Sequence, residues 1–362
     1  MSDRIAGLDL IRSTAIILVV LNHTVEVACG LHDVEIVNQM STGAQRFALI
    51  GFTLGRMGVP LFFFLSGYLL LPRGFDQQST TKFYRRNVLT LLTTWELWII
   101  IYNLFGVALN GMTFDSTNEF MIQPHAFDPA ALIREMIFFK SVDMMHVWYV
   151  GVILGIYLFL PFVARVLPSM TDTQLLMLTA IAFIYCFVLP TLDLFTDVKL
   201  KPWIDMSFSG GIYGLYVVTG YILRRFEPTI ERSIKNPVLI LLTIGSIILS
   251  AGIQIEFYQR GEILLIWYDF CLLPLAALGL FIVLKRFSAR SRLVDVLSRY
   301  SFGIYLLHAP ILILMIKYDV WSTPGRSART CCLVLATVTL SSLVIGASGL
   351  APKVQRFLFR VK

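Results

Sequence analysis

The sequence predicts an all-α, polytopic integral membrane protein with about ten transmembrane helices. Of its 362 residues, 57% are hydrophobic and only 15% are charged, whereas charged residues make up about a quarter of a typical soluble domain. Apolar stretches of roughly 20 residues, enough to cross about 30 Å of hydrocarbon as a helix, recur along the whole chain. These spans are expected to be helical because a helix satisfies its own backbone hydrogen bonds in lipid.

Ten apolar stretches along the chain predict ten transmembrane spans. No block of soluble-domain size and no clear internal repeat interrupts them, so residues 1–362 are expected to form a single membrane-embedded domain. The stretches 31–54 and 110–146 are long enough to hold interfacial helices, and residues 131–140 are predicted as a short outer helix. The expected spans are residues 8–30, 50–72, 88–109, 147–168, 173–192, 208–224, 237–256, 264–284, 300–318 and 328–350.

Lys and Arg are distributed unevenly between the two sides of this predicted bundle. Nineteen of the 30 lie on the side of the N-terminus and nine on the other side. The positive-inside rule therefore predicts both termini in the cytoplasm and a multi-pass protein of the bacterial inner (cytoplasmic) membrane. Because these residues flank apolar spans, topology and anionic headgroups account for the net charge of +7 better than nucleic-acid binding does.

The N-terminal segment and the cysteines indicate no processing or metal chemistry. The first apolar segment contains Arg12 and lacks a small-residue cleavage pattern, so it is expected to be retained. The five cysteines form no ligand-spaced pair. They are interpreted as packing residues, and neither a metal nor a permanently bound cofactor is expected.

Two polar residues lie on one face of the first span. Arg12 and His23 are eleven positions apart, which is three helical turns plus about 20° and about 16 Å along the axis. Arg12 therefore lies toward the cytoplasm and His23 in the outer half of the membrane. A charge within a span costs at least roughly 2.5 kcal/mol, so such a residue is expected to face a partner or a cavity.

Each residue also has a simpler interpretation. Arg12 can snorkel to the inner headgroups, paired with Asp9 one turn earlier. His23 can be a hydrogen-bonded packing histidine. Their position on one stripe favours a functional site, in which Glu26, one turn beyond His23, is a candidate to orient the imidazole.

The second span begins with Arg56-Met-Gly-Val-Pro-Leu-Phe-Phe-Phe-Leu-Ser-Gly-Tyr at residues 56–68. Pro60 and the Ser66–Gly67 pair predict a kink or a close approach between helices. For Arg56, interfacial snorkelling and a role in a site are equally compatible with the pattern.

A basic cluster, Lys82-Phe-Tyr-Arg-Arg, follows the second span. Positive-inside anchoring explains it. The alternative is that Lys82, Arg85 and Arg86 bind the phosphate groups of a cytosolic donor, since arginine is well suited to phosphate.

Two further histidines lie near the ends of later spans, in His146-Val-Trp-Tyr and in Ser301-Phe-Gly-Ile-Tyr-Leu-Leu-His308. Trp148 and Tyr149 are compatible with an outer aromatic belt. His308 lies within a span just before Pro310, so its ring needs an internal partner. His32 and His125 have no motif around them.

In these four motifs the sequence resembles the acyltransferase-3 family of membrane-bound acyltransferases. The resemblance extends from the first span to the ninth and keeps the family's order. Within the family the chain is most similar to stand-alone sugar O-acetyltransferases, such as the one that modifies enterobacterial common antigen. The family often has Arg-x-x-Arg after the second span, where this chain has Lys82-x-x-Arg85 with Arg86 adjacent. The matching pieces are Arg12 and His23; residues 56–68, with Arg56 and Ser66; residues 146–149; and residues 301–308, with Tyr305.

The resemblance implies transfer of an acyl group, usually acetyl, from cytosolic acyl-CoA to a hydroxyl of a surface glycan or lipid-linked sugar. His23 is then the expected general base, because histidine exchanges protons near neutral pH. Arg12, with His308 or a backbone group, would position the donor or stabilise developing charge. An acetyl-His23 intermediate is an alternative route.

A transporter or flippase for a lipid-linked or acyl-bearing substrate is the main alternative of another class. It would use Arg12, Arg56 and His23 as gating or proton-linked groups. The missing internal repeat and the ordered motifs favour the acyltransferase.

Overall fold

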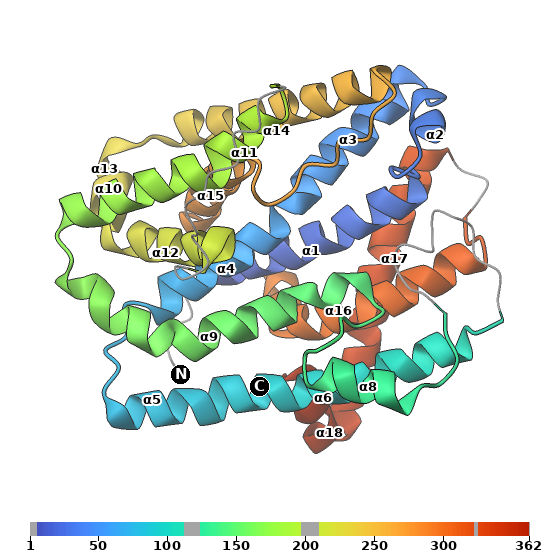
Figure 1. Cartoon of the computed structure of the whole chain (residues 1–362), viewed down its shortest axis with the longest axis horizontal. Coiled ribbons are helices and arrows are strands. Elements are labelled where there is room, and N and C mark those ends of the chain that lie inside the picture. The colour runs from blue at the N-terminus through green and yellow to red at the C-terminus, as the bar shows by residue number, and fades with distance from the viewer. Residues whose placement is uncertain (1–5, 112–123, 197–209, 322–324, 362) are drawn as a thin grey trace.

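The computed structural model describes residues 6–111, 124–196, 210–321 and 325–361, and within them the regular elements are helices. Figure 1 shows long helices lying side by side in one bundle. The helices are α1 (Ala6–Ala28), α2 (Val34–Asn38), α3 (Thr42–Arg56), α4 (Gly58–Leu70), α5 (Gln77–Phe83), η1 (Tyr84–Val88), α6 (Leu89–Ala108), α8 (Pro129–Met136), η2 (Met145–Val147), α9 (Trp148–Val166), η3 (Leu167–Ser169), α10 (Asp172–Phe183), η4 (Ile184–Val188), α11 (Leu189–Asp193), α12 (Gly211–Arg225), α13 (Glu227–Ser233), α14 (Asn236–Gln259), α15 (Leu272–Lys285), α16 (Arg292–Lys317), α17 (Arg326–Ala347), η6 (Ser348–Leu350) and α18 (Pro352–Phe359).

Eight helical stretches in the described ranges are long and apolar enough to cross a membrane. Two predicted spans are shorter, because α12 has 15 residues and α15 has 14, and about 22 Å of helix does not cross about 30 Å of hydrocarbon unaided. The first two residues of the predicted span 208–224 lie outside the described ranges. A polytopic helical protein is thus confirmed, while the count of ten stays a prediction.

The predicted span 264–284 is wrong over its first eight residues, since α15 begins only at Leu272. Residues 264–271 are not helical, and their backbone forms hydrogen bonds with side chains of neighbouring helices. The Tyr216 hydroxyl donates to the carbonyl of Tyr268 at 2.9 Å, and the Cys271 N–H donates to Oγ1 of Thr191 at 2.8 Å. Non-helical backbone within a membrane bundle is tolerated where protein groups satisfy it.

The second long helix is broken between α3 and α4, as the Pro60 pattern predicted. α3 ends at Arg56 and α4 begins at Gly58, and Pro60 has no N–H to donate back to the carbonyl of Arg56. The start of α4 packs closely against α1, because a Cβ at Gly58 would lie 2.6 Å from the Ala15 carbonyl oxygen. The break therefore places Arg56 beside the outer half of α1.

Glycines bring α4 and α12 into backbone contact, which confirms the close approach predicted at Ser66–Gly67. A Cβ at Gly67 would lie 1.8 Å from the carbonyl oxygen of Val217, and one at Gly220 would lie 2.2 Å from that of Phe64. Small residues at such crossings let membrane helices pack closely.

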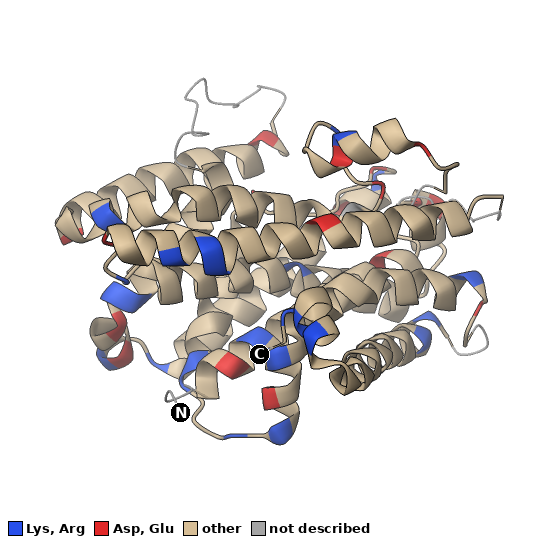
Figure 2. Ribbon diagram, turned by 90° about the horizontal axis from the view of Figure 1, so that it is seen from below, with Lys and Arg blue, Asp and Glu red and all other residues tan. Residues whose placement is uncertain are grey.

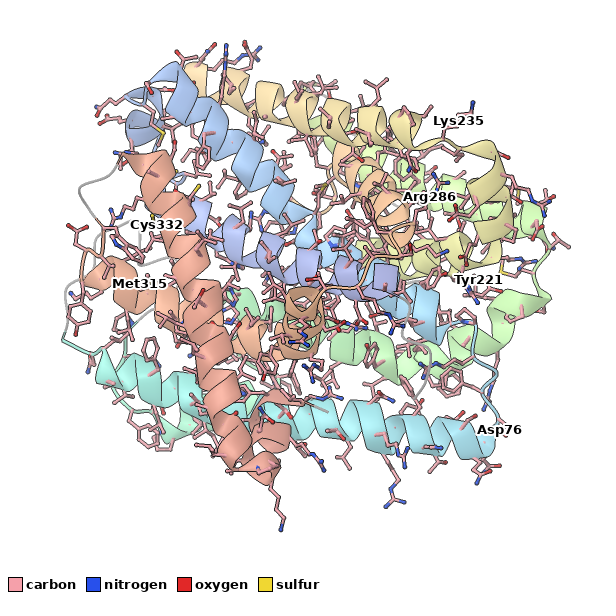
Figure 3. The ribbon with its side chains drawn as sticks, turned by 180° about the vertical axis from the view of Figure 1, so that it is seen from behind. Asp76, Tyr221, Lys235, Arg286, Met315 and Cys332 are labelled. Carbon is pink, nitrogen blue, oxygen red and sulfur yellow. The ribbon has the colours of Figure 1, made fainter. Side chains whose placement is uncertain are left out.

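The ends of the helices sort into two groups. Figure 3 shows Asp76, Tyr221, Lys235 and Arg286 toward one end of the bundle and Met315 and Cys332 toward the other. Figure 2 shows several Lys and Arg positions near the end where α1 begins. We call this end the basic end; its assignment to the cytoplasm stays a prediction.

Replacing Gly67 with alanine is expected to destabilise the protein, since the new methyl group overlaps the Val217 carbonyl, with a cost of about 1–3 kcal/mol for overpacking. Gly155→Ala in α9 is the matched control, because a Cβ there meets nothing within 4 Å. Thermal unfolding of both variants in detergent measures the difference. Equal melting temperatures would contradict the described crossing.

Candidate active site

Three histidines from separate parts of the chain meet in the bundle. The ring centroids are 4.7 Å apart for His146 and His308, 5.2 Å for His23 and His308, and 6.2 Å for His23 and His146. His308 is fully buried and His146 is 2% exposed, while His23 is half-buried. The sequence predicted each residue singly, and the structure brings the three together.

Backbone carbonyls determine which nitrogens of this cluster carry protons. Nδ1 of His308 lies 2.6 Å from the Tyr305 carbonyl oxygen and 3.2 Å from that of Ile304. Carbonyls only accept, so Nδ1 of His308 is protonated and Nε2 of the neutral ring is an acceptor. Nε2 lies 3.2 Å from Nδ1 of His23. We infer that Nδ1–H of His23 donates to His308, which leaves the lone pair of His23 on Nε2.

Pro310 frees a carbonyl that helps to hold the cluster. Because Pro310 has no N–H, the carbonyl of Leu306 lacks its helical donor. The Tyr102 hydroxyl of α6 donates to that oxygen at 2.8 Å. The same hydroxyl oxygen lies 3.4 Å from Nε2 of His146, and the Tyr305 hydroxyl donates to the His146 carbonyl at 2.5 Å. Tyr102, which no sequence motif indicated, thereby ties His146 to α16.

A cavity of about 330 Å³ approaches the histidines from the side of Arg12. Its wall includes Arg12 and Arg73 and also Tyr305, whose ring centroid is 5.4 Å from that of His146 and 5.9 Å from that of His308. The cavity therefore extends from basic side chains to the Tyr305 ring, which separates it from the histidine cluster. Its lining residues are Arg12, Phe62, Leu65, Ser66, Leu69, Leu70, Arg73, Asn87, Tyr149, Tyr157, Ser301, Phe302 and Tyr305.

The predicted donor-contacting residues adjoin this cavity. A second cavity of about 350 Å³ shares Arg73 and Asn87 with it and is also lined by Lys82 and Arg86. A third hollow of about 910 Å³ is lined by Lys82, Arg85 and Arg86. The cluster lies where α5 passes into the π-helical turn η1, a form often found at functional sites.

Asp76 starts the helix that carries this basic cluster. Its carboxylate accepts from Oγ and from the backbone N–H of Ser79, at 2.6 Å and 2.7 Å. These hydrogen bonds favour the charged form and lower the pKa of Asp76. The cap fixes the first turn of α5.

Arg12 lines the cavity and takes part in a polar network. Its Nη1 lies 3.3 Å from Asp9 and 3.2 Å from Oγ of Ser298, and the Ser298 hydroxyl donates to Asp9 at 2.6 Å. The predicted Asp9 pair is present, and Ser298 of α16 is an addition that only tertiary packing supplies. About 16 Å of helix separates Arg12 from His23, so the two do not act on the same atom.

Glu26 does not contact His23 through any described interaction, contrary to the expectation for it. Its carboxylate lies 3.7 Å from Nη2 of Arg56 and 3.0 Å from Nε2 of His32. Glu26 is 2% and Arg56 is 4% exposed. Arg56 is thus buried against a carboxylate rather than extended to the headgroups, and His308 is the group that orients His23.

Aromatic rings surround the Arg56 guanidinium, which lies 4.6 Å from the ring centroids of both Phe52 and Trp267. Trp148 packs at 5.8 Å from Trp267, and Tyr149 lies 5.7 Å from Tyr305. Trp148 and Tyr149 therefore contact other rings of the bundle. Trp267, with 39% of its surface exposed, was absent from the predicted site because it lies in a segment expected to be a plain span.

In the described ranges, no group of three His, Cys, Asp or Glu side chains is arranged to hold a metal ion. Ser66 donates to the carbonyl of Phe62 at 3.0 Å and its Oγ lies 3.5 Å from the Tyr157 hydroxyl, so it contributes to the cavity wall. Chemically, the arrangement offers a lone pair on His23, a supporting histidine, and a basic cavity leading toward them.

Comparisons with known proteins found a family model and a relative that match this chain. The family model Acyl_transf_3, described as "Acyltransferase domain", matches residues 5–346. The chain is 26% identical over 294 residues to the "Succinoglycan biosynthesis protein ExoH" of Rhizobium meliloti (strain 1021), an alignment that covers 77% of this chain and 70% of that protein. No solved structure matches significantly.

The inferred tautomers are testable by ¹⁵N NMR of histidine-labelled protein in lipid. At neutral pH both His23 and His308 are expected to carry their proton on Nδ1, because the Tyr305 carbonyl requires it of His308. His308→Gln assigns the His308 signal by removing it, and His125→Gln is the control. A proton on Nε2 of His308 would contradict the described hydrogen bonds.

Proposed function

We propose, from the premise that this chain belongs to the acyltransferase family whose domain model spans residues 5–346, that it is a membrane O-acyltransferase acting on a polysaccharide. In finer terms, we propose that it moves an acetyl group from cytosolic acetyl-CoA to a hydroxyl of a surface glycan or its lipid-linked precursor. The observation that carries the proposal is the hydrogen-bonded pair His23–His308 near the end of a cavity that begins among basic side chains.

The donor enters in this proposal at the basic end. The phosphates of acyl-CoA are bound by Arg73, Lys82 and Arg86, which line two adjoining cavities, and guanidinium groups bind phosphate in a bidentate manner. The pantetheine arm lies past Arg12 and brings the thioester toward Tyr305. Because Arg12 lies about 16 Å from His23, it positions the donor rather than stabilising charge at the reacting carbonyl.

His23 acts as the general base on the acceptor. Its Nε2 takes the proton of the acceptor hydroxyl as that oxygen bonds to the thioester carbonyl carbon. The carbon–sulfur bond then breaks, and the leaving thiolate takes the proton from Nε2. Throughout, Nδ1–H of His23 donates to His308, which holds the ring in place and stabilises the imidazolium in the way the third group of a triad does.

The acceptor approaches from the side of Arg56 and Trp267. The exposed part of the Trp267 ring offers a flat apolar surface on which the C–H face of a sugar ring can stack. The relative in Rhizobium meliloti is named for succinoglycan biosynthesis, which supports a polysaccharide acceptor. The same Nε2 would be the nucleophile of an acyl-His23 route, which differs in releasing CoA before any acceptor is added.

Loss of the base should abolish the activity. In membranes given labelled acetyl-CoA, His23→Ala is expected to lower transfer of label to glycan or lipid by at least about 100-fold, the usual range for a general base being 10²–10⁴. His308→Gln should cause a smaller loss. His125→Gln is the control, since the contacts of His125 are with the Ala126 carbonyl and the backbone at Gly106 rather than with the three histidines. Product formed by His23→Ala at the wild-type rate would remove His23 from the mechanism.

Arg12→Lys should impair use of the donor, because a point charge does not reproduce the planar guanidinium, whose Nη1 contacts both Asp9 and Ser298. We expect a rise in KM for acetyl-CoA of about tenfold or more, corresponding to one charged hydrogen bond of about 1.5–3 kcal/mol. The exposed Arg232 at the same end supplies the control variant Arg232→Lys. Unchanged kinetics would return Arg12 to a snorkelling role.

A further inference from the structure

The C-terminal segment returns to the bundle after the last long helix. The indole N–H of Trp98 donates to the Leu358 carbonyl at 2.8 Å, and the Thr94 hydroxyl donates to the Phe357 carbonyl at 3.1 Å. Phe359 and Val361 are 4% and 8% exposed. Two side chains of α6 thus fix the backbone of α18, and two apolar side chains anchor its end.

Arg360 lies between these two anchors in a conformation that few side chains adopt. Its φ is 54° and its ψ is 26°, in the left-handed region, which disfavours residues with a Cβ. Such conformations persist where the surroundings determine them, and they gather at functional sites. In this turn Phe359 and Val361 are buried, while Arg360 between them is only partly buried.

The guanidinium of Arg360 lies beside two residues that line the 330 Å³ cavity, although Arg360 itself is not among the lining residues. It lies 5.7 Å from the ring centroid of Phe302 and within electrostatic range of the Tyr157 hydroxyl. Phe302 and Tyr157 both line that cavity, together with Arg12 and Arg73. Among the described residues no salt bridge neutralises Arg360, whereas Arg224, Arg225 and Arg286 at the basic end each pair with a carboxylate.

We propose that Arg360 is a donor-binding residue, which contacts a phosphate of acyl-CoA bound at this cavity. The inference rests on the proposed function, and it adds a residue that the sequence pattern grouped with the general positive charge of the basic end. A guanidinium with cation–π support keeps its fork free for an anion. The C-terminal turn thereby adds a positive charge to those of Arg12 in α1, Arg73 after α4 and Arg86 in η1.

The test is steady-state kinetics of the full-length protein in nanodiscs with acetyl-CoA as the varied substrate. Arg360→Gln is expected to raise KM for acetyl-CoA at least about tenfold with kcat within about twofold, since one charged contact to phosphate is lost. Arg360→Lys should recover part of the loss. The control is Arg356→Gln, because Arg356 is exposed on the same short helix and should leave KM unchanged.

A second donor, acetyl-dephospho-CoA, identifies the phosphate. If Arg360 binds the 3′-phosphate, this donor has a raised KM with wild type and the same KM with Arg360→Gln. If Arg360 binds the pyrophosphate, the variant raises KM for both donors alike.

The outcomes separate this inference from the proposed function. A wild-type protein that transfers no acetyl group overturns the function itself. An active wild type whose KM is unchanged in Arg360→Gln, or is raised equally by Arg356→Gln, overturns the role of Arg360. If Arg360→Gln fails to fold, Arg360→Lys decides: a melting temperature near wild type with KM unchanged would also overturn it.

Discussion

The hydrogen bond between Nδ1 of His23 and Nε2 of His308 is the interaction on which the rest of the site depends. It exists because the Tyr305 carbonyl holds the proton of His308 on the opposite nitrogen. The neighbouring Pro310 frees the Leu306 carbonyl for Tyr102, which in turn approaches His146. Backbone acceptors thus determine the protonation of the ring proposed as the base without a carboxylate, which suits a site where an unpaired charge is costly.

Of the charged groups, Arg56 acts electrostatically on His23, and it is compensated by Glu26. The basic side chains lie along one cavity and its neighbours, while the buried carboxylate Glu26 is compensated by Arg56 and His32. Aromatic and aliphatic residues such as Phe62 and Leu65 line the cavity between the basic side chains and Tyr305. In the proposed function, an anionic donor would thereby meet an attractive entrance, and the reacting atoms would lie in low-dielectric surroundings, where preorganised groups act strongly.

Sequence patterns correctly predicted the features that depend on residues close together along the chain. Apolar runs located eight helices, and helical periodicity placed Arg12 and His23 on one stripe. The prediction of a helix over residues 264–271 failed because their hydrophobicity matches a span, while partners on other helices bind this non-helical segment. The prediction that Glu26 orients His23 failed because it rested on helical spacing alone, whereas the carboxylate of Glu26 is compensated by Arg56 at the end of α3. Tyr102 and Ser298 join the candidate site only through tertiary packing, for which one sequence holds no signal.

In this account the His23–His308 pair catalyses transfer of an acyl group from a donor bound at the basic end to a hydroxyl that approaches from the opposite side. The most direct measurement uses sealed vesicles of uniform orientation, with labelled acetyl-CoA on one face and a glycan acceptor enclosed on the other. Label should reach the glycan only when acetyl-CoA faces the basic end carrying Arg73 and Lys82. Transfer that requires donor and acceptor on the same face would contradict the account.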